Sequence, residues 1–267
     1  MSQSLLKKKI VEDLFPLFDR LIEGGQIVER EAQVNIALDI AEAIENGKNI
    51  MVEAGVGIGK SYGYLFPALI ASIYSGRPIL IGTSSIQLSE QLVDDAHVAA
   101  SYLGMKVKVT VGKGKGNFAC LDRAIKSIKH TKKATKLKQW ILENAVGDRG
   151  KIPFLVDDSE WEEVNVDRCI FEDCDYRHEC EFYKMRSEIR EGGPSDVIIV
   201  NQDLLIAHLL KRAQTSRGFI ANRVPVIIID EAHNLEEKTR KALTRMWSPK
   251  KFKNLFKRVN KLLLRHN

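Results

Sequence analysis

The sequence lacks long apolar runs and contains few cysteine residues. No apolar stretch approaches the roughly 20 residues of a membrane-spanning helix, so we expect no membrane partner. Residues 1–10 contain lysines but neither the apolar core nor the small-residue cleavage site of a secretory signal. We therefore expect a cytoplasmic protein, and in that compartment its 4 cysteines are better suited as metal ligands than as disulfides.

The composition is that of an ordinary globular chain with a surplus of positive charge. The 267 residues are 44% hydrophobic, which is enough for one large domain or two small ones with a proper core. The formal net charge of +6 favours polyanionic partners, although many basic proteins bind none. Charge alone therefore does not predict nucleic-acid binding.

A glycine-rich stretch at residues 53–61 organises the rest of the chain. It follows a short apolar run at 49–52 and precedes an amphipathic run at 62–74, so it lies where a strand ends and a helix begins. Backbone N–H groups of small residues can surround phosphate oxygens, Lys60 can reach the outer phosphates, and Ser61 can ligate Mg²⁺. The alternative is a glycine-rich turn with a chance Lys-Ser pair. The predicted phosphate loop comprises Ala54 (in place of the pattern's first glycine), Gly55, Val56, Gly57, Ile58, Gly59, Lys60 and Ser61.

Apolar runs alternate with amphipathic stretches, which predicts an α/β fold with a parallel, doubly wound sheet. An insert of about residues 114–193 interrupts this framework, and within it residues 147–168 have little periodicity and are predicted to be loop. Pro16 is expected to kink the first helix or to split it in two. The predicted helices are 3–23, 30–45, 62–74, 86–103 and the one beginning at 204–210; the predicted strands are 49–52, 78–83, 106–111, 196–200 and 224–229.

Two carboxylates follow the last predicted strand, at Asp230 and Glu231. In an open parallel sheet, ligands bind at the carboxyl ends of the strands. Phosphoryl transfer requires a ligand for Mg²⁺, a role that suits Asp230, and a group that orients the attacking water, which suits Glu231. Asp230 could instead cap the following helix. His233 either couples the nucleotide site to motion elsewhere or is a simple packing residue.

Other polar residues allow both a functional and a purely structural interpretation. The Gln33 amide can donate to and accept from an adenine edge, or it can be a solvated helix residue. Thr83 to Ser85 can hold a second phosphate, from nucleic acid, and can also cap the helix that follows. A basic segment after the third strand forms either a phosphate track or a solvated helix face. It carries Arg123, Lys126, Lys129, Lys132, Lys133, Lys136 and Lys138.

The cysteines are spaced one plus three, with Cys120 a long loop away from Cys169, Cys174 and Cys180. Zinc sites usually show two close cysteine pairs, and their absence favours an iron–sulfur cluster. His178 lies within the group, so a zinc site with mixed ligands remains the alternative. The surrounding sequence is polar and can build little core, so a metal centre would be needed to fold it.

In chain order, residues 53–61, 112–120, the cysteine triplet, 200–205 and 230–233 resemble the XPD/DinG branch of superfamily 2 helicases. The resemblance covers about residues 30–235, and the cysteine insert before the DEAH box marks that branch. It implies a RecA-like P-loop domain, ATP and Mg²⁺, and 5′ to 3′ translocation on single-stranded DNA. It also implies a four-iron, four-sulfur (4Fe-4S) cluster on the four cysteines and adenine recognition near Gln33. The implied DNA contacts lie near Thr83, Ser84, Gln87 and Asn201.

After His233 the sequence departs from that family. The family continues with an arch-like helical insert and a second RecA-like domain carrying arginines for the ATP site, whereas here only a basic amphipathic run follows, at 250–265. We therefore expect a chain that binds ATP, turns it over poorly and needs a second motor domain as partner. The expected domains are residues 1–113 and 194–236 (the two parts of motor domain 1), 114–193 (the iron–sulfur insert) and 237–267 (the start of a truncated arch-like insert).

Two other functions compete with this interpretation. One is a non-motor module that binds ATP and single-stranded DNA and has a structural zinc or iron–sulfur site. The other is a P-loop enzyme of small-molecule metabolism, which the basic helices and the cysteine insert disfavour. Phosphate release stimulated by DNA separates the motor from the non-motor module.

Overall fold

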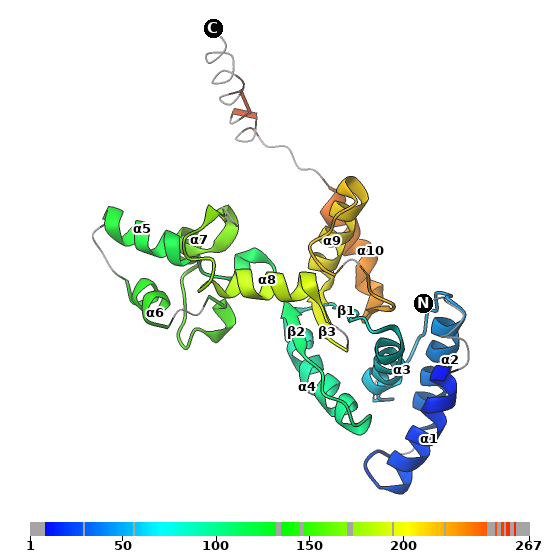
Figure 1. The fold of residues 1–267 in the computed structure, drawn as a ribbon. Coiled ribbons are helices and arrows are strands. Elements are labelled where there is room, and N and C mark those ends of the chain that lie inside the picture. Colours follow the sequence, from blue (N-terminus) through cyan, green and yellow to red (C-terminus); the bar gives the residue numbers. More distant parts are fainter. Residues whose placement is uncertain are drawn as a thin grey trace.

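A parallel sheet lies at the centre of the computed structural model (Figure 1). The structure describes residues 9–28, 30–55, 57–131, 135–144, 147–169, 173–193, 195–221 and 223–244, together with positions 249, 252, 253, 255, 256 and 259. Its described strands follow the order β2-β3-β1-β4. They are β1 (Ile79–Thr83), β2 (Val109–Gly112), β3 (Val197–Asn201) and β4 (Ile227–Ile229). The predicted α/β fold with a parallel sheet is confirmed.

β1 has a parallel neighbour on each side, with Ile81 opposite Ile199 of β3 and Ile228 of β4. Successive side chains of a strand point to opposite faces of the sheet. Ile79 and Ile81 accordingly join one buried apolar cluster, while Leu80 joins another. Because helices cover both faces, these strands are continuous apolar runs rather than alternating ones.

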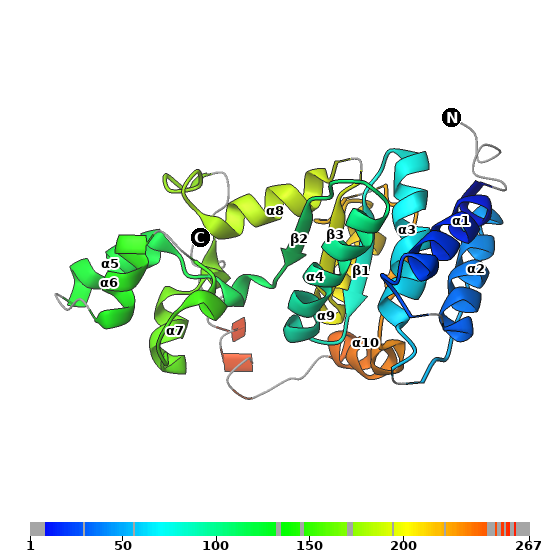
Figure 2. The same cartoon turned by 90° about the horizontal axis from the view of Figure 1, so that it is seen from below.

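Four helices pack around the first face, and Figure 2 shows α4 lying across the strands with α1 to α3 beside it. These helices are α1 (Lys9–Glu23), α2 (Glu31–Glu45), α3 (Lys60–Ser75) and α4 (Ile86–Tyr102). The Glu45 side chain accepts hydrogen bonds from the amides of Ile10 and Val11 in the first turn of α1, at 2.7 and 3.0 Å. α1 runs without a break through Pro16, so the split predicted as one of two possibilities does not occur.

The second face is covered by α8 (Glu181–Glu191), which packs on β2, and α9 (Gln202–Thr215), which packs on β1 and β3. Their buried side chains include Met185, Ile189 and Leu205, in the same cluster as Leu80 and Val200. The short helix α10 (Leu235–Leu243) follows β4 through a 3₁₀ turn (Ala232–Asn234) and packs against α9.

The insert forms a lobe that projects to one side of the sheet, with α8 running between the two (Figure 1). Its helices are α5 (Leu121–Thr131), α6 (Lys136–Asn144) and α7 (Asp158–Val164). A 3₁₀ turn precedes α5 (Lys115–Asn117), another lies between α6 and α7 (Arg149–Lys151), and a third follows α7 (Val166–Arg168). α7 lies in a stretch predicted as loop, and that prediction is wrong. Only Trp161 and Val164 of this helix are buried, too few to leave an apolar period in the sequence.

The apolar run at residues 49–52 is not part of the described sheet, although the sequence predicted a strand there. Met51 is 93% exposed, so this segment gains none of the burial that a central strand has. Most of the basic run at 250–265 lies outside the described residues. Of the arch-like insert predicted at 237–267, the continuous described part is residues 237–244, most of which belong to α10. Within the described part of the chain, no helix has both the length and the apolar character required to cross a membrane.

Candidate nucleotide site

A cavity of about 610 Å³ lies beside the carboxyl end of β4. It is lined by residues 50–54 and 227–233, by Lys60 and Tyr64 of α3 and by Ile36 of α2. The structure therefore brings Lys60, Asp230 and Glu231, which are far apart in the sequence, to one cavity at the sheet edge where ligands of parallel sheets bind.

The phosphate loop has the backbone that its glycines allow. Gly57 and Gly59 have φ angles of +82° and +83°, in the region that favours glycine. A Cβ on Gly59 would also lie 2.3 Å from the Gln33 amide nitrogen, so a larger residue would have to displace that side chain. Ala54 is not among the described residues of positive φ, which is why alanine is tolerated where the pattern has glycine. Val56 lies outside the described residues.

α2 supports the loop from behind. Gln33 is only 4% exposed, and its amide nitrogen donates a hydrogen bond of 2.7 Å to the carbonyl of Gly59. The Arg30 guanidinium donates to the carbonyl of Gly57. A buried side chain with this contact is not the solvated helix residue considered as the alternative for Gln33. Its contact with adenine remains a prediction, since the described donor atom is engaged with the loop itself.

The charged groups of the cavity face one another. The Lys60 ammonium lies 3.5 Å from a carboxylate oxygen of Glu231. Burial, together with the negative charge of Glu231, raises the pKa of Asp230, and Lys60 only partly opposes this. Two adjacent, half-buried carboxylates form a hard-oxygen environment of the kind that Mg²⁺ prefers. Asp230 thus has the surroundings that a magnesium ligand requires.

Tyr64 was not singled out from the sequence, yet it connects the two halves of the site. Burial and then the nearby charge of Asp230 raise the pKa of its phenol well above the usual range, while a hydrogen bond with Ser61 acts in the opposite direction. The Ser61 hydroxyl and the Asp230 carboxylate, the two predicted magnesium ligands, therefore both lie near one buried phenol. An aromatic residue three positions after the loop serine carries no sequence signal for this role.

The turn after β4 is strained and held in place. The amide of Asp230 donates to the carbonyl of Gly82 at 2.8 Å, so Asp230 continues the sheet ladder. The N-cap positions of the following 3₁₀ turn and of α10 are Glu231 and Asn234, so Asp230 does not cap either of them. Glu231 has a φ of +53°, in the left-handed region that non-glycine residues seldom adopt. The Gln202 amide nitrogen donates to the carbonyls of both Asp230 and Glu231. The sequence predicts a role in DNA contact for the neighbouring Asn201 but gives none to Gln202.

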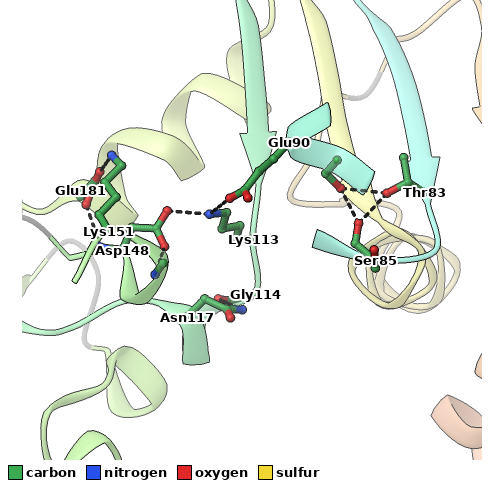
Figure 3. Close-up of polar contacts among 11 residues, drawn as sticks. Thr83, Ser85, Glu90, Lys113, Gly114, Asn117, Asp148, Lys151 and Glu181 are labelled. Atoms are coloured by element: carbon green, nitrogen blue, oxygen red, sulfur yellow. Dashed lines mark hydrogen bonds and ion pairs between the residues drawn. The ribbon is translucent and has the colours of Figure 1, made fainter. Parts of the chain in front are cut away.

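The residues predicted to contact DNA lie at the carboxyl ends of β1 and β3, and the structure gives them unequal exposure. Thr83 is fully buried, and its hydroxyl is hydrogen-bonded to Ser85 and Ser89 (Figure 3). Direct contact between Thr83 and DNA is therefore not supported, because its side chain shapes the turn instead. Ser84 is partly exposed and Gln87 is exposed on the first turn of α4. Asn201 caps α9 by accepting from the Leu204 amide at 2.9 Å.

Cys120, Cys169 and Cys180 are partly buried against the apolar cluster that α8 shares with the second face of the sheet. An antiparallel bridge pairs Ala119 with Asn165, which brings Cys120 beside the segment that ends at Cys169. Burial first, and then the charges of neighbouring groups including Cys174 and Cys180, raise the pKa of the Cys120 thiol. Burial, followed by the charges of Cys169 and Cys174, does the same for Cys180. Among the described residues, no group of three or more His, Cys, Asp or Glu side chains is arranged to hold a metal ion.

Residues 35–156 match the family described as DEAD/DEAH box helicase. The chain is 30% identical over 220 residues to the ATP-dependent DNA helicase YoaA of Escherichia coli (strain K12), a match that covers 78% of this chain and 33% of that protein. It is 26% identical over 244 residues to the ATP-dependent helicase DinG of Mycobacterium tuberculosis (strain ATCC 25618 / H37Rv), covering 80% and 35%. It is 29% identical over 256 residues to the probable ATP-dependent helicase YpvA of Bacillus subtilis (strain 168), covering 88% and 39%. The chain thus spans about a third of the length of these relatives.

The phosphate loop and the Asp-Glu-Ala-His turn, facing each other at the edge of a parallel sheet, define a P-loop domain of the DEAD/DEAH helicase type. Together with the relatives named YoaA and DinG, these features support a DinG-type superfamily 2 helicase N-terminal region. The resemblance inferred from the motifs is thereby confirmed.

Proposed function

We propose that this chain is the ATP-binding half of an ATP-dependent DNA helicase that moves 5′ to 3′ on single-stranded DNA. The observation that carries the proposal is the cavity in which Lys60 faces Glu231 at 3.5 Å, with Asp230 beside it. Lys60 binds the outer phosphates, Ser61 and Asp230 hold Mg²⁺, and Glu231 orients the attacking water. A second motor domain supplies the remaining cation for the transition state, and the protein works in the cytoplasm.

The nucleotide assignment is tested by Lys60→Ala. The change removes a charge-assisted contact with phosphate and little packing, so nucleotide affinity should be lost while the melting temperature stays close to that of the wild type. Lys108→Ala is the matched control, because Lys108 makes an exposed ion pair with Glu188 away from the cavity. Equal affinity for a fluorescent ATP analogue in all three proteins would refute the assignment.

We also propose that Cys120, Cys169, Cys174 and Cys180 hold a 4Fe-4S cluster. Their one-plus-three spacing supports it, as do the backbone bridge that brings Cys120 next to the Cys169 segment and the electrostatic coupling among the thiols. Such a cluster would supply cross-links to a region with a small apolar core. His178, the alternative zinc ligand, is exposed, and its ring accepts from the Arg177 guanidinium at 3.1 Å.

Metal analysis after anaerobic purification decides between the two metals. Iron with inorganic sulfide is expected, and about one zinc per chain without iron would overturn the cluster. Cys174→Ser should lose the metal and expose amides of the insert to hydrogen exchange, while ATP binding persists. Loss of ATP binding in the same variant would show that the two regions fold as one unit.

A further inference from the structure

Gln202 follows the carboxyl end of β3, and its side chain reaches the turn after β4, on the other side of β1. It is the first residue of α9 and is 0% exposed. Its amide nitrogen donates to the carbonyl of Asp230 at 2.8 Å and to that of Glu231 at 3.0 Å. One buried side chain therefore engages the backbone of both carboxylate residues of the nucleotide site.

The turn that Gln202 engages needs such support. Glu231 has a left-handed backbone, which is unfavourable for a residue with a side chain and persists only where surrounding contacts enforce it. Both amide hydrogens of Gln202 are required for the two carbonyls, which fixes how the amide is oriented. Its amide oxygen has no hydrogen-bond partner in the part of the chain that the structure describes. The side chain is therefore oriented by its donors alone.

The same junction reaches the edge predicted to face DNA. Asn201 precedes Gln202 and caps α9, which fixes where the helix begins. Lys238, on the helix after the turn, donates to the carbonyl of Ser84 at 2.6 Å and forms an ion pair with Asp203 at 3.0 Å. Hydrogen bonds and one ion pair thus link the turn after β4 and its following helix with the start of α9 and the loop after β1.

We propose that Gln202 is a positioning residue that sets the Asp230–Glu231 turn against Lys60 and links it to the loop at Ser84. This inference rests on the proposed nucleotide site. Gln202 touches neither phosphate nor metal; it acts through the backbone of the two carboxylate residues. Its loss should therefore impair the contribution of Mg²⁺ to ATP binding more than the contribution of the phosphate loop.

The experiment measures the affinity of a fluorescent ATP analogue for the whole chain, with Mg²⁺ and with EDTA. Gln202→Leu keeps the size of the side chain and removes both donors. It should lower the Mg²⁺-dependent gain in affinity about 10- to 100-fold, the usual cost of losing a group that orients a metal ligand, and leave the affinity in EDTA unchanged. Gln202→His keeps one N–H donor and should recover part of the gain.

Gln214→Leu is the matched control, because Gln214 is exposed near the other end of α9. An equal fall in affinity with and without Mg²⁺, together with a lowered melting temperature, would show general damage and overturn the proposal. An unchanged Mg²⁺-dependent gain would overturn it as well. If Gln202→Leu does not fold, Gln202→His decides by the same ratio. A wild-type chain that binds no nucleotide would instead refute the proposed function.

Discussion

In the sheet domain, buried apolar side chains of four helices meet over one face of the strands, whereas in the insert charged side chains join the short elements. The apolar cluster of the insert is small and comprises Ala119, Ala124, Leu137, Ile141, Trp161 and Val164. Hydrophobic burial is not directional and tolerates small shifts, while a buried ion pair depends on both partners and on their geometry. The two regions should therefore lose stability in different ways when a side chain is replaced.

Lys113 is the centre of the polar junction between the two regions (Figure 3). It is 8% exposed and pairs with Asp148 of the insert at 2.7 Å and with Glu90 of α4 at 2.8 Å. Burial alone would lower the pKa of Lys113, but the two carboxylates outweigh it and the pKa is raised. The ammonium thus ties the helix that starts at the predicted DNA edge to the lobe that carries the cysteines.

Glu181 extends the junction to the cysteines, since it follows Cys180 directly. It accepts hydrogen bonds from the amides of Gly147 and Asp148 at 2.7 and 2.8 Å and forms an ion pair with Lys151. Burial favours its neutral form, but these donors prevail and hold the pKa of Glu181 below its usual value. The comparison indicates that the position of the insert depends on charge.

The largest effect is expected in the apolar region. Phe66 is fully buried, packs edge-on against Phe18 and is stacked on Tyr62. Phe66→Ala should lower the free energy of unfolding by about 3–5 kcal/mol, because it leaves a cavity that the helices cannot close. Hydrogen exchange under mild denaturant should accelerate in β1 and β3. If exchange were accelerated as much, but only in α6 and α7 of the insert, the division into two regions would be contradicted.

A smaller and more local effect is expected at the junction. Lys113→Met leaves Asp148 buried without its cation, and removing one partner of such a pair costs about 3–5 kcal/mol when burial is complete, and less here because Glu90 is exposed. Protection of the amides at residues 147–151 should be lost first. The double variant with Asp148→Asn should recover part of the loss. Lys108→Met is the control, and its exposed pair should contribute about 0–1 kcal/mol.

The sequence predicted those parts of the molecule that rest on a short-range pattern. Continuous apolar runs predicted β1, β3 and β4, and the small residues before Lys60 predicted the phosphate loop. The carboxylates after β4 could be assigned to a ligand site because ligands of open parallel sheets bind at the carboxyl ends of the strands. In each case the responsible residues are neighbours in the chain.

The remainder depends on contacts between distant residues. Gln202 and Tyr64 are important because of where Asp230 lies, and no local signal distinguishes them from other polar or aromatic helix residues. The run at 49–52 has the composition of a strand, but strand formation requires a pairing partner that the described sheet does not give it. The helix α7 was missed because only two of its residues are buried.

A moderate, pH-dependent effect is expected at His208, on the second face of the sheet. Its Nδ1 accepts from the amides of Phe219 and Ile220, each at 3.1 Å, and burial and the charge of Arg212 lower its pKa. The contribution of His208 to stability is therefore fully present above its pKa in the unfolded chain, about 6.5, and declines as the pH falls below that value. The decline arises because the unfolded chain binds the proton more readily. Urea midpoints between pH 8 and pH 5 measure this decline.

His208→Gln keeps an acceptor without a titrating group, so its decline at acid pH should be shallower than that of the wild type. His97→Gln changes an exposed histidine on α4 and serves as the control. Identical curves for wild type and His208→Gln would show that other groups cause the acid sensitivity.

The smallest effect concerns the basic residues of the insert, which the structure divides into two kinds. Arg123 donates to Asn165 and to the carbonyl of Glu162, and Lys138 is buried against Glu163 at 2.9 Å, so both hold the lobe together. Lys129 is exposed on α5, while Lys132 and Lys133 lie outside the described residues. Only exposed lysines can replace the counterions of a phosphate backbone.

Lys129→Ala should therefore weaken binding to single-stranded DNA equally for all base sequences and reduce the slope of log affinity against log salt by about one. The melting temperature should not change, because the side chain is solvated. Lys138→Ala should do the reverse, lowering the melting temperature through the uncompensated Glu163 while leaving the slope of the remaining folded protein unchanged. Fluorescence anisotropy with a labelled oligonucleotide at several salt concentrations measures both slopes. A flat salt response of the wild type would identify these lysines as a solvated face and would place any DNA contact at the edge formed by Ser84, Gln87 and Asn201.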